Sequence, residues 1–142
     1  MPQLLRNSDQ GWQIVDEPDA QWQSLSDWQA AGGSRGRVTV NVDSEPDQSW
    51  LSAGAIAVDF PALTDGRGLS LAVLLRTRYG YTGDLVARNG VHEDVVHFLA
   101  RCGFNVIELP QGRDLQTALR WVSPHTDYYQ ASVSNPTPHF LN

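Results

Sequence analysis

The sequence contains no lysine and only one cysteine, and each shortage excludes a kind of chemistry. Without lysine, the chain has neither a Schiff-base nucleophile nor the lysine of a phosphate-binding loop. With Cys102 alone, it forms no intrachain disulfide, no cysteine-ligated iron–sulfur cluster and no cysteine zinc knuckle. Because Cys102 falls on the apolar stripe of an expected helix, we interpret it as a packing residue rather than a nucleophile.

Basic runs and long apolar runs are also missing. All ten basic residues are arginine, and the formal net charge is −6. An acidic chain without a basic run argues against nucleic acid or an anionic membrane as a partner. The amino terminus lacks a charged leader followed by a long apolar run, and no segment is long enough to cross a bilayer. We therefore expect a cytoplasmic protein.

Motifs for cofactors and metals are absent as well. His92 and His97 are five residues apart, whereas the helical zinc motif needs a spacing of four; at about 100° per residue the two side chains diverge by roughly 140°. The sequence has no dinucleotide-binding fingerprint and no serine nucleophile elbow. We predict neither a resident cofactor nor a metal site.

The 142 residues are 41% hydrophobic and 18% charged, which fits one folded domain. From residue 37 onward, segments with strand patterns alternate with segments whose apolar residues recur at helical spacing. The expected strands are 37–42, 55–60, 84–88 and 104–109, and the expected helices begin near Leu71 and span 91–102 and 115–122, the last capped by Asp114. This alternation predicts a small three-layer α/β domain with a mostly parallel sheet, either flavodoxin-like or similar to half of an α/β barrel.

The first part of the chain is less regular. We expect residues 1–50 to form a tryptophan-rich arm with a short hairpin and the first strand, residues 51–130 to form the α/β core, and residues 131–142 to be a mobile tail of the same domain. The hairpin would pair residues 4–6 with residues 12–15. Four tryptophans precede residue 51, and we favour core packing over a protein-binding face for them.

Polar chemistry is concentrated after the apolar strand 55–60. The carboxyl ends of parallel strands are where open α/β sheets bind ligands. Glycine amides at the start of the next helix could face an anion, an arginine could clamp a carboxylate, sulfate-like oxyanion or phosphate, and an aspartate could act as a base. The candidate residues are Asp59, Thr64, Asp65, Gly66, Arg67, Gly68 and Ser70. The ligand-site hypothesis requires a free guanidinium on Arg67. The alternative is a turn and helix cap in which Arg67 pairs with Asp59.

A second set of candidates combines arginine with aromatic residues, the composition of interface hot spots. These candidates for docking a protein partner are Arg76, Arg78, Tyr79, Tyr81 and Arg101. The competing interpretation is that the two helix ends, 78–81 and 101–104, are structural, with glycine in a left-handed turn and an aromatic packing back.

Several unusual sequence blocks occur in order between about residue 50 and residue 130. They are VDFP (58–61), TDGRG (64–68), LLRTRYGYTG (74–83) and RCGF (101–104). In these blocks the chain resembles the bacterial family catalogued as domain of unknown function 934. It differs where family members usually have aromatics, at Leu63 and Leu69, and where they have glutamine, at Val95.

The resemblance implies a role in sulfite reduction, because family members are typically encoded beside a sulfite reductase haemoprotein and described as probable oxidoreductases. It implies sulfite reductase or its electron donor as a partner. We therefore expect an accessory protein of assimilatory sulfite reduction. The alternative is a small enzyme or binding module for an oxyanion or phosphorylated metabolite at the loop of residues 64–70.

Overall fold

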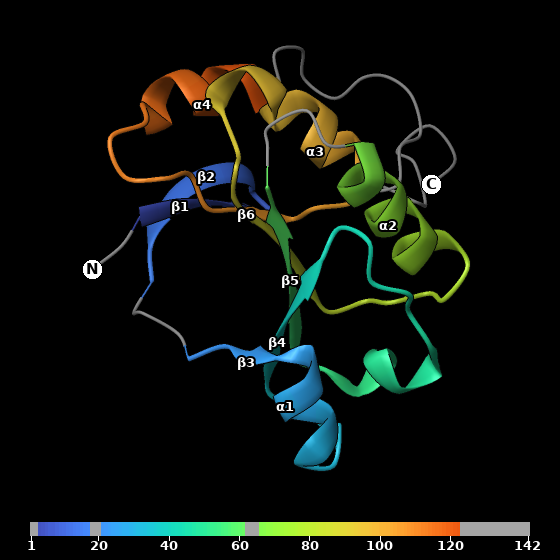
Figure 1. The fold of residues 1–142 in the computed structure, drawn as a ribbon. Helices are drawn as coiled ribbons and strands as arrows, with labels where there is room; N and C mark the ends of the chain where they lie inside the picture. Colours follow the sequence, from blue (N-terminus) through green and yellow to red (C-terminus); the bar gives the residue numbers. More distant parts are fainter. Residues whose placement is uncertain (1–2, 18–20, 62–65, 123–142) are drawn as a thin grey trace.

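The computed structural model describes residues 3–17, 21–61 and 66–122. One sheet and its flanking helices account for most of them (Figure 1). In chain order the elements are β1 (Gln3–Ser8), β2 (Gly11–Asp16), β3 (Gln23–Ser24), α1 (Leu25–Ala30), β4 (Arg37–Asn41), η1 (Gln48–Ser52), β5 (Ala55–Phe60), α2 (Gly66–Thr77), β6 (Asp84–Asn89), η2 (Glu93–Val95), α3 (Val96–Cys102), β7 (Val106–Ile107) and α4 (Leu115–Val122).

The sheet has seven strands in the order β2-β1-β7-β6-β5-β4-β3. Strands β3 to β7 run parallel to one another, while β1 and β2 form an antiparallel hairpin in which β1 also pairs antiparallel with β7. The α/β class, the mostly parallel sheet and the hairpin are thus confirmed. The parallel strands follow one another in chain order, so the described strands lack the reversal of order that defines a doubly wound sheet.

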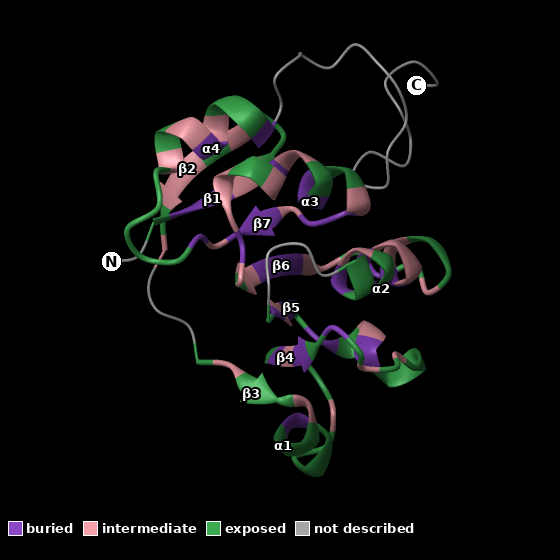
Figure 2. Cartoon of the chain, turned by 45° about the horizontal axis from the view of Figure 1, so that its top comes forward, coloured by how far each residue is buried: buried purple, intermediate pink, exposed green. Residues whose placement is uncertain are grey.

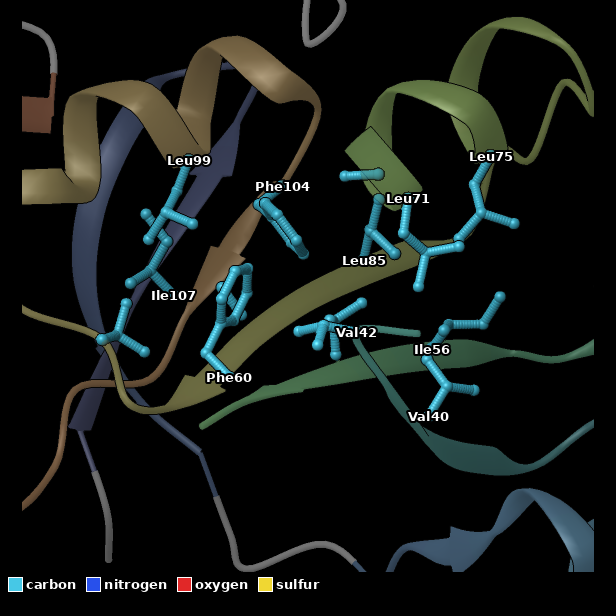
Figure 3. Close-up of a cluster of buried hydrophobic side chains, with 14 of the residues drawn as sticks. Val40, Val42, Ile56, Phe60, Leu71, Leu75, Leu85, Leu99, Phe104 and Ile107 are labelled. Atoms are coloured by element: carbon cyan, nitrogen blue, oxygen red, sulfur yellow. The ribbon is translucent and has the colours of Figure 1, made fainter. Parts of the chain in front are cut away.

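The four α-helices of the described residues pack on the same face of the sheet. Along β5, Ile56, Val58 and Phe60 alternate toward the large apolar cluster that also holds the buried residues of the helices. Figure 3 shows the Phe60 ring between Leu99 of α3 and Leu71 of α2 in this cluster. The parallel strands lie in the sheet in the order in which they occur in the chain. When such strands are joined by right-handed crossovers, every connecting helix lies on the same face of the sheet.

The other face carries a smaller cluster, made of the buried residues Leu4, Ala57, Val86 and Val106 with partly buried Val15 and Trp22. None of these residues belongs to a helix. The described part of the chain therefore has two layers, and the prediction of three layers is wrong for it. Figure 2 shows the buried strands β5, β6 and β7 with α2 and α3 to one side.

The sheet is curved, and the length of one connection requires it. Strands β2 and β3 lie at opposite edges, yet only the six residues 17–22 join them. Seven chain steps reach about 25 Å at most, whereas six spacings across a flat sheet would need about 29 Å. Trp22 belongs to the helix-free cluster, and the sheet curves around this face, which is the concave one (Figure 1).

The tryptophan arm is part of the core. Trp28 and Trp50 are 1% and 0% exposed, which confirms the prediction of core packing for these two. Trp28 Nε1 also donates a hydrogen bond to the Arg35 carbonyl at 2.7 Å. Among the described residues no helix is long and apolar enough to span a membrane. The predicted tail, 131–142, lies outside the described residues.

Candidate functional site

A row of polar residues crosses three neighbouring parallel strands near their carboxyl ends. Asn41 of β4 is in register with Asp59 of β5, which is in register with Arg88 of β6. Because Val58 and Phe60 point to the helices, Asp59 points to the concave face. The sequence thus builds a polar row at the sheet edge where α/β proteins bind ligands.

Asp59 is held from two sides through one oxygen. Arg88 Nε lies 3.0 Å from its Oδ1, and Asn89 Nδ2 donates a hydrogen bond to the same Oδ1 at 2.7 Å. Burial raises the pKa of Asp59, while the positive charge of Arg88 acts in the opposite direction. A half-buried carboxylate of this kind is suited to accepting a hydrogen bond or a proton from a ligand.

Trp22 supports the cationic partner of this pair. The Arg88 and Arg37 guanidinium carbons lie 5.5 Å and 5.6 Å from the centroid of the Trp22 ring. Both distances are within the range of cation–π attraction. The tryptophan therefore fixes the arginine that neutralises Asp59.

Asn89 ends β6 in an unusual conformation, with φ of 72°. Asparagine tolerates this left-handed region better than most residues. The turn is held by hydrogen bonds from Gly90 N to the Phe60 carbonyl at 2.8 Å and from Val91 N to the Asn89 carbonyl at 2.7 Å. It is in this turn that the Asn89 amide hydrogen-bonds to Asp59.

A cleft of about 480 Å³ lies at this edge of the sheet. Its lining combines polar groups from the ends of β4, β5 and β6 with an arginine of α2 and a few apolar side chains. The residues are Asn41, Val42, Asp43, Asp59, Phe60, Pro61, Arg67 and Asn89. We call this the carboxyl-edge cleft. A second hollow of about 560 Å³ shares Val42, Asp43 and Arg67 with it and extends along α2 past Gly66 and Ser70.

The predicted ligand residues are only partly brought together. Asp59 and Arg67 line the carboxyl-edge cleft, whereas Gly66 and Ser70 line only the second hollow. Arg67 is exposed but takes part in an interaction of its own, so the expectation of a free guanidinium is wrong. Asp59 pairs with Arg88 rather than Arg67. Thr64 and Asp65 lie outside the described residues.

Gly68 has a packing role. A Cβ atom at this position would overlap the Phe60 ring, so the glycine lets α2 approach β5 closely. At Gly66 an added Cβ would meet nothing within 4 Å. The two glycines of the predicted loop therefore differ: one is needed for packing, and the other has no steric requirement in the structure.

Two of the predicted docking residues, the partly buried Arg76 and the buried Tyr81, take part in hydrogen bonds within the protein. The Arg76 guanidinium donates hydrogen bonds to the carbonyls of Gly103, Tyr81 and Gly83 at 2.8–2.9 Å, and to Asn105 Oδ1 at 3.2 Å. Tyr81 is 3% exposed, and its hydroxyl donates to the Ala53 carbonyl at 2.9 Å. Tyr81 is therefore inaccessible to a partner, and the guanidinium of the partly buried Arg76 is bound within the protein. Burial lowers the pKa of Arg76 and raises that of Tyr81.

The other docking candidates remain at the surface. Arg78 and Arg101 are exposed, and Tyr79 is half-buried with its hydroxyl donating to the Pro46 carbonyl at 3.1 Å. Two large aromatics that the sequence did not single out, Phe98 of α3 and Trp121 of α4, are each 53% exposed.

Cysteine and histidine behave as structural residues. Burial raises the pKa of the half-buried Cys102 thiol, which disfavours the reactive thiolate. His92 caps η2, its Nδ1 accepting a hydrogen bond from Asp94 N at 3.1 Å. Within residues 3–17, 21–61 and 66–122, no group of three or more histidine, cysteine, aspartate or glutamate side chains is placed to hold a metal.

Sequence reasoning missed the three other polar residues that line the cleft, Asn41, Asp43 and Asn89. A signal for them was present, because each lies at the end of a predicted strand or within two residues of it, as Asp59 does. Once parallel strands are assumed, the last polar residues of neighbouring strands belong to one edge.

A known protein family matches most of the chain. Residues 39–140 match the family described as "Bacterial protein of unknown function (DUF934)". The match covers more than half of the chain, so the protein belongs to this family, as the sequence blocks predicted. No curated protein and no solved structure matches the chain.

Proposed function

We propose that this protein binds a small polar metabolite in the carboxyl-edge cleft. One observation carries the proposal: side chains from the ends of three neighbouring parallel strands and from the first turn of α2 line the same hollow. Ligand sites usually combine such a concave position with a few convergent polar groups.

The arrangement of the sheet gives further support. Parallel strands in chain order with helices on one face resemble half of a β/α barrel, the second of the two predicted architectures. In barrels of this type the ligand binds at the carboxyl edge, whereas the opposite edge serves stability. Asp59 and Arg67 would contact the ligand, and Arg88 and Asn89 would position Asp59.

Thermal unfolding with candidate ligands tests this function. We would measure Tm with sulfite, sulfate and a panel of phosphorylated sugars, because ligand at about 100 times its Kd stabilises the folded state by about 2.7 kcal/mol. We expect a saturable rise in Tm that Arg67→Ala abolishes. Arg120→Ala, on the exposed side of α4, is the control. A shift unaffected by Arg67→Ala would place the ligand elsewhere.

A second function, that of an accessory protein of assimilatory sulfite reduction, is supported by the surface of α3 and α4. The two helices contact each other, and each exposes one large aromatic, Phe98 and Trp121. Arg101 is exposed one helical turn after Phe98. Exposed aromatics beside arginine are typical of protein interfaces, and the family resemblance supplies sulfite reductase or its electron donor as the partner.

Copurification tests the accessory role. The tagged protein should retain sulfite reductase haemoprotein or its electron donor, and Trp121→Ala together with Arg101→Glu should release it, whereas Arg67→Ala should not. Growth of a deletion strain provides the genetic counterpart. Poor growth on sulfate with normal growth on cysteine is expected, and equal growth on both would contradict a role in sulfite reduction.

A further inference from the structure

We propose that the ligand of the carboxyl-edge cleft is a zwitterion of the α-amino acid class, with its ammonium group at Asp43 and Asp59 and its carboxylate at Arg67. The inference rests on the proposed binding function and narrows it, because it replaces the oxyanion expected from the sequence with a ligand that carries both charges.

The charged residues that line the cleft favour a ligand that carries both a positive and a negative charge. The cleft presents two carboxylates, Asp43 and Asp59, and one guanidinium, Arg67. The exposed Asp43 carboxylate would repel a simple oxyanion, whereas Asp59 is already paired with Arg88. The Arg67 guanidinium would repel a simple cation. A ligand with an ammonium group at one end and a carboxylate at the other meets an opposite charge at each end.

The two carboxylates retain acceptor capacity. Both contacts that Asp59 makes, to Arg88 and Asn89, use Oδ1. No described residue donates a hydrogen bond to Asp59 Oδ2 or to the exposed Asp43 carboxylate. An ammonium group has three N–H donors, which is enough for a hydrogen bond to each carboxylate.

Arg67 can bind a carboxylate in addition to the contact it already makes. Its guanidinium carries five N–H donors in a planar fork. That fork matches the two oxygens of a carboxylate. Arg67 also lies at the junction of the carboxyl-edge cleft and the second hollow, so a ligand held there has access to both spaces.

The rest of the lining fits the remainder of such a ligand. Val42 and Pro61 give the cleft an apolar wall for a side chain. Asn41 and Asn89 supply amide groups that donate and accept hydrogen bonds. At about 480 Å³, the space is within the range of small-molecule sites, about 300–1,000 Å³.

Calorimetric titration of the full chain with each of the twenty standard amino acids tests the inference. For every amino acid that binds, the N-acetyl derivative removes the ammonium charge and the amino acid amide removes the carboxylate. We expect saturable binding of at least one amino acid and at least tenfold weaker binding of both its derivatives. Binding of a derivative as tight as that of the parent would overturn the zwitterion.

Two matched pairs of variants locate the ligand. Asp43→Asn and Arg67→Gln remove one charge each from the cleft, and each should weaken binding at least tenfold. Asp16→Asn on β2 and Arg120→Gln on α4 remove the same charges at exposed positions elsewhere and should leave binding unchanged. Binding that is the same in all four variants would overturn the assignment to this cleft.

Parallel titrations separate this inference from the function on which it rests. If sulfite, sulfate or a sugar phosphate binds in a manner that requires Arg67 while no amino acid binds, the zwitterion is wrong and the metabolite-binding function stands. If none of these probes gives saturable binding, both proposals fail.

Discussion

Similar residues have opposite roles at the carboxyl and amino ends of the parallel strands, which we call the carboxyl edge and the amino edge of the sheet. At the carboxyl edge, Asp43, Asp59 and Arg67 line an open cleft. At the amino edge, Arg76 binds three carbonyl groups and Asn105, and Asn105 in turn donates to Asp84 Oδ1 at 3.0 Å and accepts from Leu85 N at 2.8 Å. The polar groups of the amino edge are therefore bound to one another.

This difference shows that residue type alone does not identify a binding surface. An arginine beside an aromatic is a hot spot when both are exposed, but Arg76 beside Tyr81 is a closed structural network. In sheets built like a β/α barrel, one edge serves stability and the other serves function. Substitutions at the amino edge should therefore change the free energy of unfolding, and substitutions at the carboxyl edge should change binding.

The largest effect is expected for Arg76→Ala. The substitution leaves the carbonyls of Tyr81, Gly83 and Gly103 without their shared donor, and buried unsatisfied groups cost about 1–3 kcal/mol each before relaxation. We expect the free energy of unfolding, measured with urea, to fall by about 2–4 kcal/mol. The exposed Arg78→Ala should stay within about 0.5 kcal/mol of wild type. Equal losses in the two variants would contradict the closed network.

Gly68→Ala should come next, with a loss of about 1–3 kcal/mol from overpacking against Phe60. The matched control is Gly66→Ala, where the added methyl meets nothing within 4 Å and lower entropy of the unfolded chain should stabilise by about 0.4–1 kcal/mol. The measurement is again urea unfolding. A lower free energy of unfolding in Gly68→Ala and a higher one in Gly66→Ala would sharpen the distinction between packing and cleft positions. A neutral Gly68→Ala would refute the packing role.

Tyr81→Phe should cost about 1 kcal/mol, because it removes the hydrogen bond to the Ala53 carbonyl but keeps the ring. Tyr79→Phe, whose hydroxyl is only half-buried, should cost less in the same thermal or urea unfolding experiment. A larger cost at Tyr79 would mean that the surface hydroxyl, rather than the buried one, anchors the loop before β6.

The smallest effect concerns the pH dependence at Asp59. Burial raises the pKa of this carboxyl, so the folded state binds its proton more readily than the unfolded state. The contribution of Asp59 to stability is therefore present below about pH 4 and is lost as the pH rises through the raised pKa. Wild type should lose stability relative to Asp59→Asn between pH 3 and pH 7, measured by Tm. A gain in wild-type stability relative to Asp59→Asn over this pH range would show that the charge of Arg88 changes the pKa of Asp59 more than burial does.

Much of the fold could be predicted because local patterns specify it. The continuous apolar runs of β5 and β6, the left-handed Gly103 after α3 and the Asp114 cap of α4 are all local features. The strand order, the single helical layer and the curvature depend on how distant segments pair. The sequence therefore left both the flavodoxin-like and the half-barrel architectures open.

The candidate site could be predicted to a similar extent. Asp59 and Arg67 follow from the strand and loop on which they lie, whereas Asn89 reaches Asp59 through a left-handed turn that no local pattern indicates. The burial of Arg76 and Tyr81 could not be foreseen, because their partners are main-chain carbonyls of distant turns. Such carbonyls are the same for every sequence and leave no signature.

The position of β1 determines where this chain tolerates truncation. The family match begins at residue 39, yet β1 covers the outer side of β7, and Arg6 pairs with Asp84 Oδ2 at 3.0 Å. A fragment starting at residue 39 would turn β7 into a bare edge strand, with backbone groups ready to pair with another molecule. We expect such a fragment to self-associate, because the folding unit extends beyond the matched residues 39–140.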